Sequence, residues 1–170
     1  MTVTAVQKDT DALTLDLTAE FDATPERVWQ LWEDPRQLER WWGPPAYPAT
    51  FTEHDLRPGS RVAYHMTGAS GDQPRGWWEI LEVDPPRGLS FRDGFANEDG
   101  SPNPDFPEVT VHVAIEEIGA GRTRMTIQSR YPTPAAMEQL VAMGMVEGLT
   151  DAVGQIDAIL AEDAVPATHS

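Results

Sequence analysis

Histidine side chains are the first candidates for chemistry in this chain, and the sequence has four: His54, His65, His112 and His169. His65 and His112 alternate with apolar neighbours, which predicts that they lie on the polar faces of strands. His54 shares a strand face with Leu56 and is a candidate for an interior position, whereas His169 lies in the C-terminal tail. No His-x-Glu-x-x-His spacing occurs, so no histidine metal site is predicted.

A carboxylate inside an apolar cavity would be another route to catalysis. Residues 76–83 have the pattern of a strand, with Trp77 and Trp78 on opposite faces. If the face of Trp77 is buried, Glu79 is buried with it, and burial would raise the pKa of its carboxyl group towards that of a general acid. The other register buries Trp78 and leaves Glu82 near the strand end. The pattern leaves both registers open.

Acidic residues also gather between Asp93 and Asp105, in a segment rich in proline and glycine. Carboxylates are calcium ligands, but the glycine and glutamate spacing of an EF-hand loop is absent. Residues 94–108 are therefore predicted to form a long solvated loop or a lid over a cavity. The sequence also lacks a Gly-x-Ser-x-Gly elbow and a phosphate-binding glycine loop. We predict no metal and no cofactor.

Composition limits the class of partner. The chain has 170 residues, enough for one domain with a core, and its 28 acidic and 12 basic residues give a net charge of -16. This charge repels nucleic-acid backbones and anionic membranes, so neither is an expected partner. The absence of cysteine excludes disulfides and thiolate chemistry. No apolar run reaches about 20 residues and no signal-peptide pattern occurs, which predicts a cytoplasmic protein without membrane insertion.

Two short helices must follow one another between Asp22 and Pro44. Thr24-Pro25 and Asp34-Pro35 each combine a good N-cap with a proline suited to the first helical position. Apolar residues recur at helical spacing in both segments, and Gly43-Pro44 ends the second one. Four of the six tryptophans lie in this stretch. So much aromatic surface indicates that the helices cover a core or the mouth of a cavity.

The rest of the chain predicts an α+β fold. Alternating apolar residues indicate strands at 13–18, 49–56, 62–67, 76–83, 89–95, 109–116 and 123–131. Short connections make the sheet antiparallel. One long helix at 134–162 must cover its apolar face, with a bend or a new start near Gly144. We expect a curved sheet of about six to seven strands wrapped around this helix, in a single domain at 13–162 between a flank at 1–12 and a tail at 163–170.

Several motifs resemble one known family. Pro25-Glu26-x-Val28-Trp29 and Asp34-Pro35-x-x-Leu38-x-x-Trp41-Trp42-Gly43-Pro44 resemble the START-like (SRPBCC) superfamily. Within it, the similarity is to relatives of the C-terminal domain of the activator of heat-shock protein 90 ATPase. Asp55-Leu56-Arg57-Pro58-Gly59, Glu82-Val83-Asp84-Pro85-Pro86-Arg87 and Gly144-Met145-x-Glu147-Gly148 agree with this family. Ser60 departs from it, because many relatives have a second glycine there.

The resemblance implies a helix-grip fold with an internal cavity. Members include carriers of lipids and other hydrophobic ligands, co-chaperone domains and polyketide cyclases. We therefore expect a small hydrophobic or amphipathic ligand in a cavity between the sheet and the C-terminal helix. One alternative is a protein-interaction module for a chaperone in the stress response. Another is a cyclase- or dehydratase-like enzyme that uses a cavity carboxylate or histidine. Relatives are often dimers, and an exposed Trp41-Trp42 end would suit a homodimer interface.

Candidate ligand-binding residues are the aromatic, methionine and polar side chains that the patterns place inward. Methionine suits an adaptable ligand surface, and tyrosine or histidine would orient a polar group. The same side chains would equally fill an ordinary core. The candidates are Trp41, His54, Tyr64, Met66, Trp78, Phe91, Met125, Met145 and Leu149.

Overall fold

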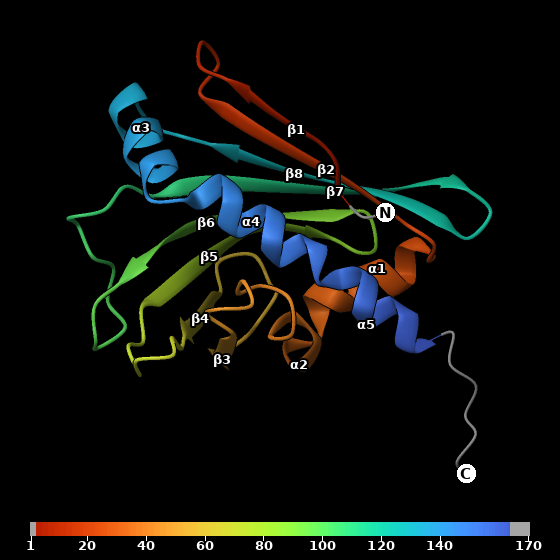
Figure 1. The fold of residues 1–170 in the computed structure, drawn as a ribbon, viewed down its shortest axis with the longest axis horizontal. Helices are drawn as coiled ribbons and strands as arrows, with labels where there is room; N and C mark the ends of the chain where they lie inside the picture. The colour runs from red at the N-terminus through yellow and green to blue at the C-terminus, as the bar shows by residue number, and fades with distance from the viewer. Residues whose placement is uncertain (1–2, 164–170) are drawn as a thin grey trace.

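An antiparallel sheet forms one layer of the protein, and helices cover one of its faces. The structure is a computed structural model and describes residues 3–163. The described sheet has eight strands in the order β1-β2-β8-β7-β6-β5-β4-β3. Its strands are β1 (Val3–Asp9), β2 (Thr14–Phe21), β3 (Ala49–Glu53), β4 (Arg61–Met66), β5 (Arg75–Asp84), β6 (Gly88–Ala96), β7 (Val109–Gly119) and β8 (Arg122–Arg130). Figure 1 shows the strands behind the helices.

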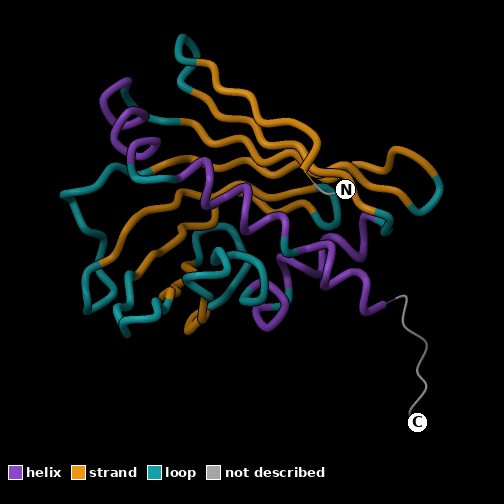
Figure 2. Tube along the Cα trace, in the orientation of Figure 1, coloured by secondary structure: helices purple, strands orange, loops and turns teal. Residues whose placement is uncertain are grey.

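The helices fall into two groups. Helices α1 (Pro25–Glu33) and α2 (Pro35–Leu38) connect β2 to β3. Helices α3 (Pro134–Ala142), α4 (Met145–Gly154) and α5 (Ile156–Asp163) follow one another after β8. In Figures 1 and 2, α4 runs across the face of the sheet and leads into α5, which lies beside α1. No helix within residues 3–163 is long and apolar enough to cross a membrane.

The α+β helix-grip prediction is confirmed, with two differences in detail. The first is β1, which pairs with β2 at the sheet edge and adds a strand to the predicted six to seven. Its residues are mostly exposed, so they lack the apolar alternation that marks a half-buried strand. The second is the C-terminal helix, which consists of three segments. The chain leaves helical geometry at Gly144, where φ is +88°, as predicted. At Gln155 the backbone stays in the right-handed helical region, and this residue only separates α4 from α5.

An aromatic cluster forms the centre of the core. Trp32, Trp41 and Trp42 from the α1–α2 region meet Trp78 and Phe91 from the sheet. Trp78 stacks on Phe91 with ring centroids 4.1 Å apart, and Trp32 meets Trp41 edge-to-face at 4.8 Å. Such pairs contribute roughly 0.5–1.5 kcal/mol beyond the burial of their area. Trp41 and Trp42 are buried, so the expectation of an exposed tryptophan end for a dimer interface is wrong.

The two short helices begin where the sequence predicts. The side chain of Thr24 accepts a hydrogen bond from the Arg27 amide, and that of Asp34 accepts one from the Arg36 amide. Each cap satisfies an amide that the first helical turn leaves without a partner. Because α1 and α2 are short, tertiary packing of their tryptophans must supply most of their stability.

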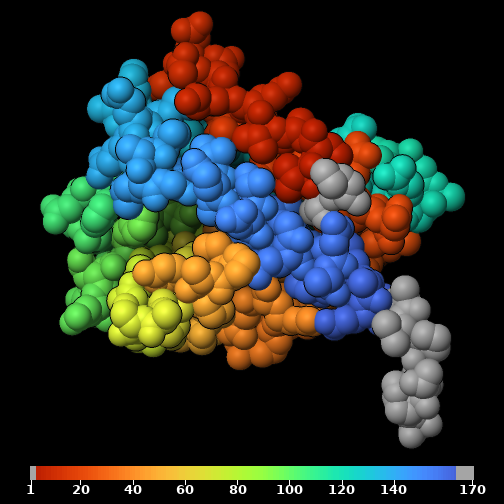
Figure 3. Space-filling model, in the orientation of Figure 1, coloured from red at the N-terminus to blue at the C-terminus, as the bar shows by residue number. Residues whose placement is uncertain are grey.

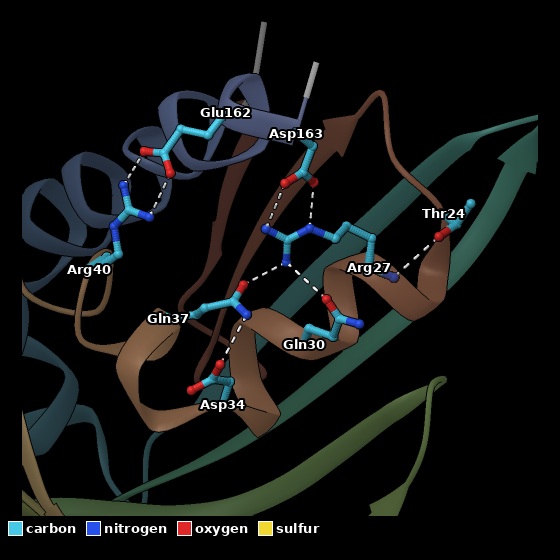
Figure 4. A network of polar contacts seen from close by, with 8 residues as sticks. All are labelled: Thr24, Arg27, Gln30, Asp34, Gln37, Arg40, Glu162 and Asp163. Atoms are coloured by element: carbon cyan, nitrogen blue, oxygen red, sulfur yellow. Dashed lines mark hydrogen bonds and ion pairs between the residues drawn. The ribbon is translucent and has the colours of Figure 1, made fainter. Parts of the chain in front are cut away.

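Polar contacts attach the C-terminal helix to this helical pair. In Figure 4, Arg27 pairs with Asp163 and Arg40 pairs with Glu162. The side chain of Gln155 donates to the carbonyl oxygens of Trp41, at 3.3 Å, and Gly43, at 2.7 Å. The ion pairs are partly exposed and contribute little each, whereas the Gln155 amide fixes the backbone directly beside the tryptophan cluster.

Gly43 follows this cluster at a point where no side chain fits. A Cβ atom there would lie 2.1 Å from the Tyr47 carbonyl oxygen and 2.8 Å from the Ala49 amide nitrogen. Both atoms belong to the backbone, so neither can move without shifting the start of β3. The Gly43-Pro44 motif thus reflects close approach of two backbone segments.

We expect Gly43→Ala to lower the free energy of unfolding by about 1–3 kcal/mol or more, because overpacking against backbone cannot relax. Gly154→Ala is the matched control, since no atom lies within 4 Å of its added Cβ, and it should keep or slightly raise stability. Urea denaturation of both variants measures the difference. Equal free energies of unfolding for Gly43→Ala and Gly154→Ala would show that the backbone at Gly43 tolerates a side chain.

Candidate functional site

A cavity of about 320 Å³ lies between the sheet and helices α3 and α4. This volume is within the usual range for small-molecule sites, roughly 300–1,000 Å³. Most of its wall is apolar or aromatic. Residues from the strands and from the two helices contribute, among them Tyr64, Met66, Val109, Val111, Ile127, Leu140, Met145 and Leu149.

The cavity is open to solvent where loops meet the break between α3 and α4. Pro44, Pro74 and Pro107 border it from the loops, and Met143, which is 49% exposed, borders it from the end of α3. Figure 3 shows a hollow between the blue helices and the orange and yellow chain, with green strands at its bottom. The left-handed backbone at Gly144 therefore lies at the opening.

One pair of polar groups lies on the cavity wall. The Tyr64 hydroxyl donates a hydrogen bond to Asp93 Oδ1, at 3.1 Å. Tyr64 comes from β4 and Asp93 from β6, and the register of β5 between them places Trp78 opposite Asp93. Asp93 keeps some accessible surface, which it exposes to the cavity, but protein atoms otherwise enclose it.

Enclosure changes the acidity of both groups. Burial raises the pKa of the Asp93 carboxyl group to about 7, although the Tyr64 hydroxyl and the Trp78 indole oppose the rise. Burial, followed by the nearby Asp93 charge, raises the pKa of Tyr64 well above its ordinary value. Desolvation penalises the charged form of each group. Asp93 is thus a carboxyl group that can hold or release a proton near neutral pH.

Three further polar side chains lie near this pair. The indole Nε1 atoms of Trp42 and Trp78 are buried and form no hydrogen bond of normal geometry within the described chain, but they lie close enough to Tyr64, and Trp78 also to Asp93, to lower the pKa of these groups. Trp42 lines the cavity, while Trp78 lies behind it in the core. Ser129 also lines the cavity and is buried. The wall therefore combines an apolar surface with a few groups able to orient a ligand.

The cavity brings together some of the candidates from the sequence. Tyr64, Met66, Met145 and Leu149 line it. Trp41, Trp78, Phe91 and Met125 instead lie fully buried in the core, because the α1–α2 tryptophans need partners from the sheet. Their predicted contact with a ligand has no support from their positions.

His54 also lies away from the cavity. One of its ring nitrogens, Nε2, is 2.9 Å from the carbonyl oxygen of Trp32. This contact connects the segment after β3 to α1. His54 was one of two candidates for orienting a ligand, and it does not line this cavity.

The open question about residues 76–83 is resolved by β5. Trp78 faces the core, so Trp77 and Glu79 lie on the opposite face, where Glu79 pairs with Arg92. Glu82 is exposed. Neither glutamate is therefore the cavity acid that the sequence suggested.

Asp93 is the cavity carboxylate that this reasoning missed. Its position in an acidic, proline-rich stretch suggested a solvated loop or a lid. The alternation of β6 would have found it, since Leu89 and Phe91 are buried and Asp93 continues the same face. Farther along the loop, Asn97, Asp99 and Ser101 hydrogen-bond to one another. Residues 3–163 contain no group of three or more side chains arranged to hold a metal ion.

The fold agrees with those of known proteins. The family model of the Activator of Hsp90 ATPase homolog 1-like protein matches residues 22–161. The chain belongs to this family, within the START-like superfamily. No curated protein matches the chain.

Two solved structures resemble the chain over nearly its whole length. Protein Ms6760 from Mycobacterium smegmatis is 49% identical to this chain, and the alignment covers 99% of each chain with a TM-score of 0.85. A protein from Arthrobacter aurescens is 46% identical over 99% of both chains, with a TM-score of 0.91. DynU16, from the dynemicin biosynthetic locus, is similar in fold alone: it is 22% identical with a TM-score of 0.61, over 88% of this chain and 47% of that one.

We predict that Asp93 makes the stability of this family member depend on pH. The folded pKa of about 7 exceeds the unfolded value of about 3.9. The native state therefore binds the proton more tightly than the unfolded state does. The stabilisation that this adds is complete below about pH 4, and it is lost as the pH rises through about 7. Asp93→Asn cannot lose a proton, so its free energy of unfolding relative to the wild type should rise by about 2 kcal/mol between pH 5 and pH 8.

Urea denaturation at the two pH values provides the test. Asp99→Asn is the control, because hydrogen bonds from Ser101 lower the pKa of Asp99 and it stays charged throughout this range. A constant difference between Asp93→Asn and the wild type would mean that Asp93 titrates as an exposed carboxylate does.

Proposed function

We propose that this protein binds a small, mainly apolar molecule in the cavity between the sheet and helices α3 and α4. The observation that carries the proposal is an open cavity of about 320 Å³ with mostly apolar walls inside an otherwise packed core. Apolar side chains that line an open cavity lack packing contacts that a bound molecule would supply. Family membership supports the same proposal.

The wall has the properties that a binding site for an apolar ligand needs. Burial of apolar surface contributes roughly 25 cal/mol per Å². Met66 and Met145 add flexible, polarisable surface that can adapt to ligand shape. Tyr64 and Asp93 limit the orientations in which a ligand with a polar group can bind. Small-molecule binding therefore accounts for the cavity, its lining and its opening together.

Proton transfer on the bound molecule is a second candidate function. It is favoured by one observation, the enclosed Asp93 carboxyl group that hydrogen-bonds Tyr64 on the cavity wall. A carboxyl group with a pKa of about 7 suits general acid or base catalysis near neutral pH. The chaperone-interaction alternative, cytoplasmic localisation and dimer formation stay predictions from the sequence and its family.

The first test is native mass spectrometry of the purified protein, followed by denaturing extraction. We expect a small molecule of defined mass to accompany the wild type. Leu149→Trp should remove it, because the larger ring fills space at the cavity wall. Leu81→Trp is the matched control: Leu81 is 38% exposed and does not line the cavity, so this variant should retain the molecule.

An empty protein needs a second measurement, in which thermal shifts are recorded against apolar and aromatic compounds. Stabilisation of the wild type and of Leu81→Trp, but not of Leu149→Trp, would support the cavity as the site. Equal stabilisation of all three proteins would place binding elsewhere. No stabilisation, combined with capture of a heat-shock protein 90 homologue in a pull-down, would favour the protein-interaction alternative.

A further inference from the structure

A second hollow, which we call the outer hollow, lies on the face of the sheet opposite the ligand cavity. Its volume is about 620 Å³. Thr110 lines the outer hollow, whereas Val109 and Val111 on either side of it line the cavity. Arg130 and its neighbour Ser129 are divided between the two spaces in the same way. Because side chains alternate between the faces of a strand, the two spaces lie on opposite faces of the sheet.

The outer hollow lies where the sheet opens between β6 and β7. The last residues that these strands pair are Asp93 and Val109, although β6 continues to Ala96 beside β5. Beyond Asp93, the neighbour of β6 is the loop that returns to β7, with an isolated bridge between Ala96 and Pro102. Figure 1 shows this connection, in green, extending beyond the end of the sheet.

Few backbone hydrogen bonds can hold this loop against β6. The Asn103 amide donates to the Phe95 carbonyl oxygen, at 2.8 Å. Pro102, Pro104 and Pro107 have no amide hydrogen to donate. A segment with so few backbone hydrogen bonds separates from its neighbour at a lower cost in free energy than a regular pair of strands does.

A single side chain separates the outer hollow from the ligand cavity. Phe95 lines both spaces. Its ring contacts that of Phe106, with centroids 4.8 Å apart, and both residues are partly exposed. Phe106 lines the outer hollow and Pro107 lines the cavity, so the loop itself borders one space and then the other. Rotation of the Phe95 ring to another rotamer would connect the two spaces without any change in the strands.

We propose that the outer hollow is a second entrance to the ligand cavity, between β6 and β7, and that Phe95 and Phe106 form its gate. The inference rests on the proposed function and adds a route by which an apolar molecule reaches the site. The cavity then has one opening beside Gly144 and a gated one on the opposite face of the sheet.

Blocking each entrance in turn tests the proposal. The chain has no cysteine, so a single introduced cysteine can carry a maleimide-linked polymer at a chosen place. Thr110→Cys puts the polymer at the outer hollow, and Met143→Cys puts it at the opening beside Gly144. Leu81→Cys is the matched control, because Leu81 is exposed and lines neither space.

Stopped-flow fluorescence with N-phenyl-1-naphthylamine, an uncharged apolar dye, measures entry and exit. Loss of dye binding in Leu149→Trp would locate the dye in the cavity. Labelling Thr110→Cys should slow association and dissociation by the same factor, about twofold or more, because one of two parallel routes is closed and the bound state is unchanged. Labelling Leu81→Cys should change neither rate constant. Phe106→Ala removes one side of the gate and should raise both rate constants.

The outcomes separate this inference from the proposed function. If labelling Thr110→Cys leaves both rate constants unchanged, the second entrance is overturned and cavity binding stands. If that label lowers the affinity without slowing both steps equally, the dye binds in the outer hollow itself, and the gate is overturned. If the dye does not bind the unlabelled protein, cavity binding of such molecules fails and the inference fails with it. Should Phe106→Ala not fold, labelled Thr110→Cys decides, because Thr110 is exposed.

Discussion

The aromatic cluster between the α1–α2 region and the sheet is the constraint on which the rest of the structure depends. Trp32, Trp41 and Trp42 come from one short stretch of chain, yet their partners Trp78 and Phe91 come from the middle of the sheet. Short helices are marginal alone, so this packing fixes where they lie. The C-terminal helix is then positioned from the same cluster, through the contacts of α5 with α1 and of Gln155 with the following backbone.

The interior is densely packed at the tryptophan cluster and open near Gly144. Helix α5 is held by side-chain contacts at the cluster, whereas the break at Gly144 separates α3 from α4 beside the opening. The core therefore changes from densely packed tryptophan to a cavity within the length of one helix. Trp42 marks the boundary, since it contacts Trp78 on one side and lines the cavity on the other.

Local signals in the sequence predicted the elements better than the site. Thr24-Pro25 and Asp34-Pro35 specified helix starts because capping depends on neighbouring residues alone. Strand β1 was missed because an exposed edge strand needs no apolar alternation. The sequence also could not distinguish residues of the cavity wall from residues of the packed core. Phe91 and Tyr64 both alternate inward, and only the three-dimensional position of the helices decides which one borders the space.

Charge gives an independent reason to expect a neutral ligand. The chain has a net charge of -16, and within residues 3–163 ion pairs with carboxylates engage eight of the arginines, including Arg27, Arg40 and Arg92. An anionic molecule would be repelled as it approached. A cation would be attracted to the surface but would lose its hydration in the apolar cavity. An uncharged molecule avoids both costs.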